Sequence, residues 1–411
     1  MKLADFLIIG GGVAGTTAAE TLRELDPYAS ISIIDAEPYP LYSRVMIPGY
    51  LKHKTKRNAI FLRKISDYAA KKIGLYSSLV VSKIDYQKRE VYTENGEIFP
   101  YKKLLIASGG APKPWFLPGL AAEDFFGRIL RMHTLDDADN ILSKMKTHAA
   151  SVSKDATQAG GQALVVGEGF IALEFIESFL KNGFTVHTVS KENYFNEKRF
   201  GINGGKIMQD AFSRNGVITH RGTEPASING MEITLRNGER LSPALVGVGV
   251  GILRNLDSFG EIKKNIGILT NEFFETSEEN VYAAGDAAEF FDTYAGIQRT
   301  VGNWTNSFLQ GRAAGLNMFA SLSGDTEKRA PYRAIPAYNI INLKLNLTFV
   351  GYLDDADDFW EKLYEGGITR VFLKGEKIRG AVLINRFNDK IKIAELIKLG
   401  GDKNELEKTF L

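Results

Sequence analysis

Short apolar runs alternate with longer amphipathic stretches at the start of the chain. Phe6–Ile9 and Ile31–Ile34 are typical of buried parallel strands, and Val13–Leu25 between them has the spacing of a helix. Together they predict one β-α-β unit. Further along, "EVYTENGEIFPYKKLLIASGG" predicts a hairpin that turns at Asn95-Gly96 and continues into an apolar strand.

A second copy of this order begins at Ala163. Another β-α-β pattern is followed by an Asn-Gly hairpin, "MEITLRNGERL", and then by the apolar strand Ala244–Val248. The repeat covers the whole order of elements, which predicts two structural units of one type.

A glycine-rich turn follows the first predicted strand. "FLIIGGGVAG" places Gly10, Gly12 and Gly15 in G-x-G-x-x-G spacing, and Asp35 closes the second strand. Such glycines let the backbone approach a pyrophosphate, and the helix that follows offers unpaired N–H groups and a positive dipole end. Asp35 can accept both hydroxyls of an adenosine ribose, with Glu37 as a less favoured substitute. Strand, helix and acid at the right distances indicate a dinucleotide-binding unit.

The second glycine turn lacks the acid that completes the first. "ALVVGEGFIA" contains Gly167, Gly169 and Ala172, and Ser190-Lys191 stand at the ribose position. An acid there repels a 2′-phosphate, whereas a hydroxyl and an ammonium can bind one, so the pair favours NADPH or use of both nucleotides. The alternative is that Lys191 points into water and NADH binds through other contacts. A chance second turn within one domain is a further alternative, but the repeated order of elements disfavours it.

The pattern changes beyond about Arg329. Short strands are predicted first, then a helix around Asp357–Tyr364, strands at Thr369–Leu373 and Ile378–Leu383, and a helical C-terminal stretch. The predicted fold class is therefore α/β, with two Rossmann-like dinucleotide-binding domains and a small α+β C-terminal domain. Small, polar residues near Thr147–Gly161 predict a flexible surface loop.

Composition narrows the chemistry. The 411 residues contain no cysteine and five histidines, with a formal net charge of +2. Disulfides, redox dithiols and thiolate metal sites are excluded within this chain, and a multi-histidine metal site is not expected. The charge is too small to indicate nucleic-acid binding. The N-terminal apolar run is too short for a signal peptide, and no stretch has the ~18 apolar residues of a membrane span, so a cytoplasmic protein is expected.

Four further segments resemble those of the pyridine nucleotide–disulfide oxidoreductase superfamily. Within it, they resemble most the rubredoxin/ferredoxin reductases and the flavin domain of NAD(P)H nitrite reductase. The segments are "EPYPLYSRVMIPGYL", "YKKLLIASGGAPKPWFLPG", "TSEENVYAAGDAAEF" and "NWTNSFLQGRAAGLNM". With the glycine turns they cover roughly residues 1–320, and the rest of the chain resembles the family's interface domain more loosely.

The resemblance implies a glutathione-reductase-like arrangement of domains. The expected ranges are 1–115 with 275–325 for the FAD-binding domain, 116–274 for the NAD(P)-binding domain and 326–411 for the C-terminal interface domain. Beyond the first glycine turn and Asp35, the implied FAD-binding residues are Arg44, Val81, Ala107, Ser108, Gly109, Asp286 and Trp304. The second turn, with Ser190 and Lys191, is implied to hold NADH or NADPH, and Glu174 lies where the family's glutamate approaches the nicotinamide ring.

Four of these residues also have plainer interpretations. Arg44 could be a surface arginine, and Trp304 could belong to the core. Asp286 precedes small residues that suggest a helix start, so it could serve only as an N-cap. Glu174 could be a solvated residue on a helix.

Two departures from the family pattern bear on function. The redox cysteines of disulfide-using relatives are missing, and Gly49 stands where ferredoxin reductases often carry a lysine. The siroheme and iron–sulfur parts of nitrite reductase are also missing. The resemblance therefore implies a flavin-only oxidoreductase that passes electrons from NAD(P)H through FAD to a carrier such as rubredoxin or ferredoxin. The alternatives are an enzyme that reduces oxygen or a quinone, and a non-catalytic FAD-binding sensor protein.

A basic run follows the segment that contains Arg44. It consists of Lys52, Lys54, Lys56 and Arg57. Such a run could steer an acidic electron carrier, although charge runs more often form solvated faces. The sequence also leaves a homodimer open.

Overall fold

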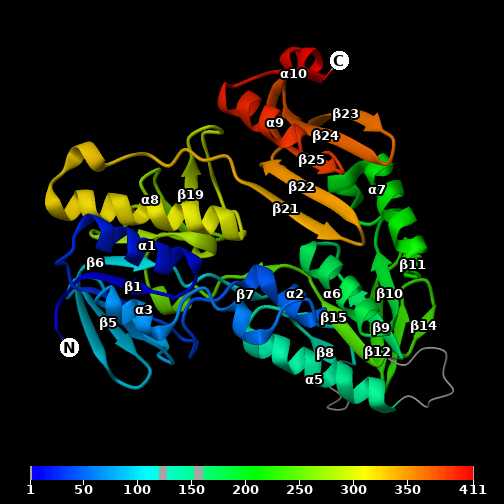
Figure 1. Cartoon of the computed structure of the whole chain (residues 1–411), viewed down its shortest axis with the longest axis horizontal. Coiled ribbons are helices and arrows are strands. Elements are labelled where there is room, and N and C mark those ends of the chain that lie inside the picture. Colours follow the sequence, from blue (N-terminus) through cyan, green and yellow to red (C-terminus); the bar gives the residue numbers. More distant parts are fainter. Residues whose placement is uncertain (1, 120–126, 152–160, 411) are drawn as a thin grey trace. The chain divides into compact units, whose positions relative to one another are not determined.

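The computed structural model describes residues 2–119, 127–151 and 161–410 (Figure 1). Contacts divide the chain into two compact units, each assembled from three segments. Unit 1 comprises Met1–Ser43, Arg57–Ala111 and Leu253–Pro336, and unit 2 comprises Arg44–Lys56, Pro112–Ile252 and Ala337–Leu411. The three-domain division expected from the sequence stays a prediction.

A parallel sheet forms the centre of unit 1, with strand order β3-β2-β1-β6-β18. Its strands are β1 (Ala4–Ile9), β2 (Ile31–Ile34), β3 (Ile73–Tyr76), β6 (Ile98–Ile106) and β18 (Val281–Ala283). The strands β4 (Val81–Asp85) and β5 (Glu90–Thr93) extend β6 as an antiparallel meander. The turn at Asn95-Gly96 joins β5 to β6, which confirms the predicted hairpin.

Helices cover this sheet because their apolar faces match its buried strands. Helix α1 (Val13–Leu25) has the predicted bounds and packs along α8 (Trp304–Ser323). The approach is close, since a Cβ on Gly311 would lie 2.2 Å from the carbonyl oxygen of Ala14. Unit 1 also contains α3 (Ile65–Ala70) and a small sheet of β17 (Ile268–Thr270), β19 (Ala288–Asp292) and β20 (Ile297–Arg299).

Unit 2 repeats the parallel architecture with strand order β11-β10-β9-β15-β8. These strands are β8 (Ile129–Leu130), β9 (Gln162–Val166), β10 (Thr185–Ser190), β11 (Ile218–Arg221) and β15 (Leu245–Val248). Its helices are α2 (Ile47–Leu51), α5 (Leu135–Ser151), α6 (Phe170–Lys181) and α7 (Glu197–Arg214). An antiparallel sheet of β12 (Pro225–Asn229), β13 (Glu232–Leu235) and β14 (Arg240–Leu241) contains the second predicted hairpin. Both parallel sheets confirm the expected fold class.

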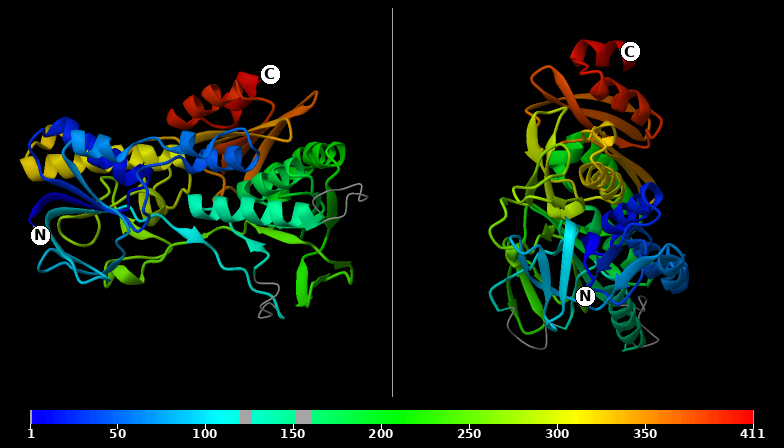
Figure 2. Two further views of the ribbon diagram at one scale, coloured as in Figure 1. Left: turned by 60° about the horizontal axis from the view of Figure 1, so that its bottom comes forward. Right: turned by 90° about the vertical axis from the view of Figure 1, so that its left-hand side faces the viewer.

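The C-terminal part of unit 2 is an antiparallel sheet with strand order β21-β22-β25-β24-β23. The strands are β21 (Ala337–Asn342), β22 (Leu345–Gly351), β23 (Asp358–Tyr364), β24 (Gly367–Lys374) and β25 (Lys377–Ile384). Helix α9 (Asp389–Lys398) packs on β22 and β25 and contacts α10 (Lys403–Phe410), and Figure 2 shows both helices in red beside the orange strands.

Two local predictions were wrong. Residues 358–364 form strand β23 instead of a helix, because they pair along their whole length with β24. Glu361 stands opposite Arg370 in that pairing and forms an ion pair with it. The loop predicted near Thr147–Gly161 is wrong for its first residues, because helix α5 continues to Ser151. The rest of that segment, residues 152–160, lies outside the described residues.

Among the described residues, no helix combines the length and the apolar character needed to cross a membrane.

Candidate functional site

The first glycine turn has the shape of a phosphate-binding turn. Gly10 has a φ of +104°, and a Cβ there would lie 2.3 Å from the carbonyl oxygen of Ala107. A Cβ on Gly15 would lie 2.0 Å from the carbonyl oxygen of Gly10. Among the described residues, apart from its chain neighbours, nothing lies within 4 Å of the would-be Cβ of Gly12, the N-cap of α1. There is room in front of this helix end, and the residues present fit a pyrophosphate.

Asp35, more than Glu37, is placed to serve this turn. A Cβ on Gly11 would lie 2.5 Å from Oδ2 of Asp35, so the carboxylate stands against the turn. The carboxylate of Glu37 accepts a hydrogen bond of 2.6 Å from the hydroxyl of Tyr42 and is engaged there.

The other residues implied for FAD in unit 1 lie on several elements. The Ala107 N–H donates to the carbonyl oxygen of Ile9 at 2.8 Å, which ties Ala107-Ser108-Gly109 to the end of β1. Gly109 has a φ of +72°. The side chain of Val81 is buried in the core, and its role toward FAD stays a prediction.

Asp286 lies in a short 3-10 helix, Gly285–Ala287. Its Oδ1 accepts a hydrogen bond of 3.1 Å from the Ser307 hydroxyl, and its carbonyl oxygen accepts one from Nε of Arg254. The expectation of a helix start here was wrong, because strand β19 follows and pairs with β17 and β20. Helix capping therefore does not explain this aspartate.

Trp304 and Arg44 are both only partly exposed. Trp304 is the first residue of α8, whose N-cap is Asn303, and Oδ1 of Asn303 accepts from the N–H of Asn306 at 2.8 Å. Arg44 belongs to unit 2, where its Nη1 donates to the carbonyl oxygen of His133 at 2.6 Å. Arg44 is therefore not a freely solvated arginine, and the roles of both residues toward FAD stay predictions.

The second glycine turn repeats the construction of the first. Gly167 has a φ of +117°, and a Cβ there would lie 2.2 Å from the carbonyl oxygen of Gly249. Gly169 is the N-cap of α6, and no described residue other than its chain neighbours lies within 4 Å of its would-be Cβ. Ala172 is fully buried in the first turn of that helix. This turn also fits a pyrophosphate.

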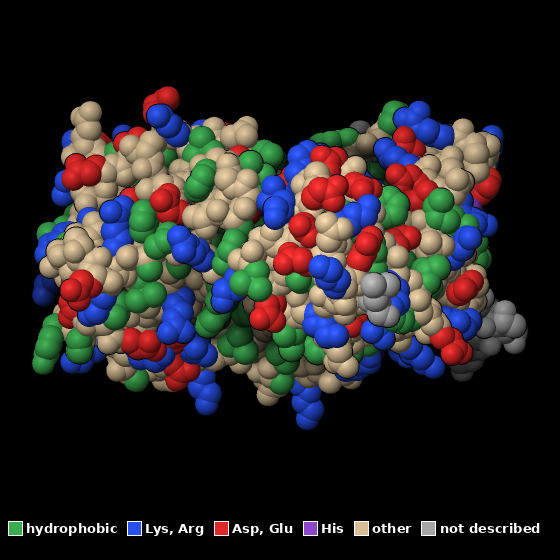
Figure 3. All heavy atoms as spheres, turned by 90° about the horizontal axis from the view of Figure 1, so that it is seen from above, with side chains coloured by type: hydrophobic (Ala, Val, Ile, Leu, Met, Phe, Trp, Pro, Cys, Tyr) green, Lys and Arg blue, Asp and Glu red, His purple; other side chains and the backbone are tan. Residues whose placement is uncertain are grey.

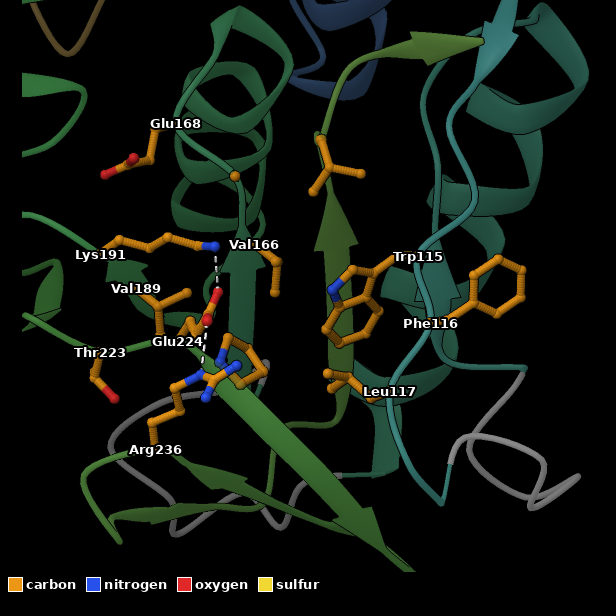
Figure 4. A pocket seen from close by; sticks show the side chains of 13 residues that line it. Trp115, Phe116, Leu117, Val166, Glu168, Val189, Lys191, Thr223, Glu224 and Arg236 are labelled. Atoms are coloured by element: carbon orange, nitrogen blue, oxygen red, sulfur yellow. Dashed lines mark hydrogen bonds and ion pairs between the residues drawn. The ribbon is translucent and has the colours of Figure 1, made fainter. Parts of the chain in front are cut away.

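Ser190 and Lys191 have partners that the sequence does not reveal. Ser190 is buried, and its hydroxyl donates to Oε1 of Glu168. Nζ of Lys191 lies 2.6 Å from Oε2 of Glu224, and Nε of Arg236 lies 2.6 Å from Oε1 of the same carboxylate (Figure 4). The Lys191 ammonium, with help from Arg236, lowers the pKa of Glu224. The Lys191 side chain is 72% exposed, so the alternative that it points into water holds in part, but its ammonium is paired with Glu224.

A cavity of about 480 Å³ lies at the carboxyl ends of β9 and β10, and its polar lining includes Glu168, Lys191, Glu224 and Arg236. Figure 4 shows Trp115 and Leu117 on one side of it and Lys191 and Glu224 on the other. Its apolar lining includes Trp115, Leu117, Val166, Val189 and Val250. A cavity of this size and mixed lining, at the carboxyl ends of parallel strands, suits an adenosine group.

Glu174 lies in an ion-paired cluster of unit 2. Nζ of Lys52 lies 2.8 Å from Oε2 of Glu174 and 2.7 Å from Oε2 of Glu177. The side chains of Lys52 and Glu174 are only 7% and 14% exposed, so the solvated interpretation of Glu174 was wrong. Asn342 of β21 adds a hydrogen bond of 3.3 Å to Oε2 of Glu177.

Burial and charge act against each other in this cluster. Burial opposes the charge on Lys52, but Glu174 and Glu177 outweigh it and raise the pKa of Lys52. Burial also raises the pKa of Glu174, and the Lys52 ammonium offsets this only in part. The cluster therefore holds a buried ammonium between two carboxylates.

The predicted basic run is smaller than the sequence suggests. Lys52 is occupied in the cluster, and Arg57 packs over the ring of Tyr39 at 5.6 Å. Lys54 and Lys56 are exposed.

Sequence reasoning missed Glu168, Glu224 and Arg236, and the pairing of Lys52. Glu168 was visible inside the G-x-G turn, but the pairs of Glu224 and of Lys52 join distant parts of the chain. Within the described residues, no group of three or more His, Cys, Asp or Glu side chains is arranged to hold a metal ion.

Comparison with known families and proteins gives a consistent result. Residues 4–311 match the family described as pyridine nucleotide-disulphide oxidoreductase. The chain is 28% identical over 319 residues to the NADH-rubredoxin oxidoreductase of Clostridium acetobutylicum, which covers 77% of this chain and 75% of that protein. It is 24% identical over 407 residues to the assimilatory nitrate reductase electron transfer subunit of Bacillus subtilis, which covers 96% of this chain. The chain spans about half, 49%, of the length of that relative.

Solved structures share the fold. The crystal structure of NADH:rubredoxin oxidoreductase from Clostridium acetobutylicum has a TM-score of 0.78 and 25% identity, and covers 98% of this chain and 96% of that chain. The covalent putidaredoxin reductase–putidaredoxin complex has a TM-score of 0.84 at 20% identity, and covers 98% of this chain and 96% of that chain.

Proposed function

Because the chain belongs to the pyridine nucleotide-disulphide oxidoreductase family, we propose that it passes electrons from NAD(P)H through FAD to a redox protein of the rubredoxin or ferredoxin type. The family resemblance found in the sequence is confirmed, and the chain is an FAD-dependent oxidoreductase that uses a nicotinamide dinucleotide. Bound FAD supplies the hydride and electron chemistry.

The observation that carries the proposal is the pair of glycine turns with open helix N-termini. Gly12 and Gly169 each leave space in front of a helix end, where a pyrophosphate gains backbone N–H donors and a positive dipole. Asp35 would accept the ribose hydroxyls of FAD. Lys52 would hold Glu174 in one position, because the two side chains are buried and directly bonded.

The absence of cysteine bears on the path of the electrons. These 411 residues offer no thiol to relay them, so the flavin is the redox group that the chain itself positions. An acceptor outside the chain must then take electrons from the flavin. The similarity to an NADH-rubredoxin oxidoreductase supports a protein carrier as that acceptor.

The charged side chains of the described residues on the face in Figure 3 do not form one large basic patch for an acidic carrier. Lys and Arg side chains are interspersed there with Asp and Glu. A carrier that docks by charge would therefore depend on a few positions, of which Lys54 and Lys56 are exposed candidates.

Stopped-flow reduction of the purified holoprotein tests the proposal. Mixing with NADH or NADPH should bleach the flavin band, and reoxidation should then be faster with rubredoxin or ferredoxin than with oxygen or a quinone. Faster reoxidation by a small acceptor would favour the oxidase or quinone reductase alternative. Failure of both nucleotides to bleach the flavin would favour a sensor protein.

A further inference from the structure

Strand register identifies equivalent positions in the two glycine turns. In unit 1, Ile9 of β1 pairs with Ile34 of β2. The next residues on these strands, Gly10 and Asp35, are therefore neighbours, and the Gly10 N–H donates to the carbonyl oxygen of Ile34 at 2.7 Å. The carboxylate of Asp35 thus enters the first turn from the end of the second strand.

The same register applies to unit 2. Val165 of β9 pairs with Thr188 of β10, so two residues later Gly167 and Ser190 are neighbours. Ser190 is therefore the structural equivalent of Asp35. At the end of the second strand, unit 2 therefore has a hydroxyl where unit 1 has a carboxylate.

The residue between the first two glycines differs between the units as well. At this position unit 2 has the carboxylate and unit 1 does not. In unit 1 this residue is Gly11, whose would-be Cβ points at Asp35, 2.5 Å from Oδ2. In unit 2 it is Glu168, and its carboxylate accepts the hydrogen bond of Ser190. The pair Gly11–Asp35 is thus exchanged for Glu168–Ser190, and both turns keep one carboxylate at the same corner.

Glu168 is anchored through one oxygen only. Oε1 accepts from the hydroxyl of Ser190 and from the N–H of Asn196 at 3.2 Å, and Nδ2 of Asn196 donates to the Glu168 carbonyl oxygen at 2.8 Å. Within the part of the chain that the structure describes, Oε2 accepts no hydrogen bond. Glu168 lines the cavity beside Lys191 (Figure 4), so this oxygen is available to a ligand at the turn.

The cations that could bind a 2′-phosphate are already paired. Glu224 holds both Lys191 and Arg236, with one carboxylate oxygen at 2.6 Å from each. A 2′-phosphate would have to compete with Glu224 for them, and it would also approach the carboxylate of Glu168. A ribose 2′-hydroxyl faces neither cost and can donate to Glu168.

We propose that Glu168 accepts a hydrogen bond from the 2′-hydroxyl of the adenosine ribose and thereby selects NADH over NADPH. This inference rests on the proposed function, and it reverses the preference that Ser190-Lys191 suggested in the sequence. Selection comes from the glycine turn and not from the strand end.

Calorimetric binding to the oxidised holoprotein tests the proposal without turnover. The probes are AMP and adenosine 2′,5′-bisphosphate, which differ only at the 2′ position where Glu168 would act. The wild type should bind AMP more tightly. Glu168→Gln should shift the ratio of the two affinities toward the 2′-phosphate by roughly 10- to 100-fold, the range of a hydrogen bond to a charged group. The matched control Glu192→Gln removes a nearby carboxylate outside the cavity and should leave the ratio unchanged.

A rescue variant separates the proposed role from a folding defect. Glu168→Gly should lose the preference, and the double variant Glu168→Gly with Ser190→Asp, which copies the pair of unit 1, should restore it. A wild type that prefers the 2′-phosphate, a ratio unmoved by Glu168→Gln, or a double variant without rescue would each overturn the proposal.

Flavin reduction distinguishes this failure from failure of the proposed function. If NADH or NADPH bleaches the wild-type flavin but the ratio of the two probe affinities does not change on Glu168→Gln, the proposed oxidoreductase function is supported and the role of Glu168 in selectivity is wrong. If neither nucleotide bleaches the flavin and neither probe binds, both fall.

Discussion

Lys52 and Glu174 form a buried ion pair in which Nζ lies 2.8 Å from Oε2. Gly49 stands where ferredoxin reductases often carry a lysine, and Lys52 follows three residues later. Residues three apart lie on the same face of a helix. Gly49 is itself confined, since a Cβ there would lie 2.8 Å from the hydroxyl oxygen of Thr55. The departure at residue 49 is therefore accompanied by a lysine one turn later that reaches Glu174.

Removing Lys52 should destabilise the fold in a pH-dependent way. Lys52→Met removes the buried cation that directly contacts Glu174 and Glu177, at a cost of about 3–5 kcal/mol near pH 8. Burial already raises the pKa of Glu174 above its unfolded value, so its protonated form favours folding at low pH and this contribution is lost as the pH rises. Without Lys52 this pKa rises further. The deficit in unfolding free energy, measured with urea, should therefore be larger at pH 8 than at pH 5.

Lys54→Met is the matched control for this prediction. Lys54 is 60% exposed and lies 3.8 Å from Oε1 of Glu177, so its loss should change stability by less than about 1 kcal/mol. Equal deficits at the two pH values for Lys52→Met would show that the ion pair is not the cause.

Local sequence patterns predicted the parts of the fold in which neighbouring residues decide the structure. Val13–Leu25 and Ile31–Ile34 agree with the bounds of α1 and β2, because a buried strand is a continuous apolar run and a helix face has its own period. Strand β23 was mistaken for a helix because its conformation depends on pairing with β24.

In the candidate site, too, local features could be predicted from the sequence and contacts between distant residues could not. The glycine turns have fixed spacing and were found from sequence. The partner of Glu174 is 122 residues away in the chain, and Glu224 lies 33 residues beyond Lys191, so no spacing rule links either pair. The basic run was overestimated because charge alone does not distinguish the buried Lys52 from the exposed Lys56.

Alanine at the open glycines should separate the two nucleotide sites. Within the residues that the structure describes, and apart from chain neighbours, nothing lies within 4 Å of the would-be Cβ of Gly12 or Gly169. Alanine therefore fits the protein at both positions but enters the space left for a pyrophosphate. Gly12→Ala should lower the FAD content of the purified protein. Gly169→Ala should keep its FAD and weaken NADH binding by roughly tenfold or more, a loss comparable to one charge-assisted hydrogen bond. Absorbance spectra and calorimetry measure the two effects.

Gly127→Ala serves as the control, because the contact that its Cβ would make within the described part of the chain is with the end of the Lys144 side chain, at 3.8 Å. Normal FAD content and normal NADH affinity are expected for it. If Gly12→Ala and Gly169→Ala were indistinguishable in both measurements, the assignment of one nucleotide to each turn would be wrong.

Charge changes at the exposed lysines should slow an acidic carrier. Lys56→Glu reverses an exposed charge, and Lys54→Gln removes one without adding a carboxylate beside Glu177. At low salt, carrier reduction should slow by roughly three- to tenfold in the double variant, because charged side chains steer association. Flavin reduction by NADH should be unaffected. Lys146→Glu changes an exposed charge on α5, and its carrier kinetics should match the wild type. Rates that respond neither to the double variant nor to added salt would remove these lysines as a docking site.

The stacked imidazoles of His187 and His220 should make unit 2 sensitive to acid. Their rings lie 5.3 Å apart at 16°, with Nδ1 of His187 3.0 Å from Nε2 of His220. Burial lowers the pKa of His187, and His220 lowers it further. Near pH 6.5 the unfolded chain therefore takes up a proton at His187 that the folded chain does not bind. The free energy of unfolding then falls as the pH drops below that value, by up to about 1.4 kcal/mol per pH unit.

His187→Phe, which keeps a stacked ring without a titrating group, should flatten the fall in unfolding free energy between pH 7 and pH 5. An equal slope in wild type and His187→Phe would assign the acid sensitivity to other groups.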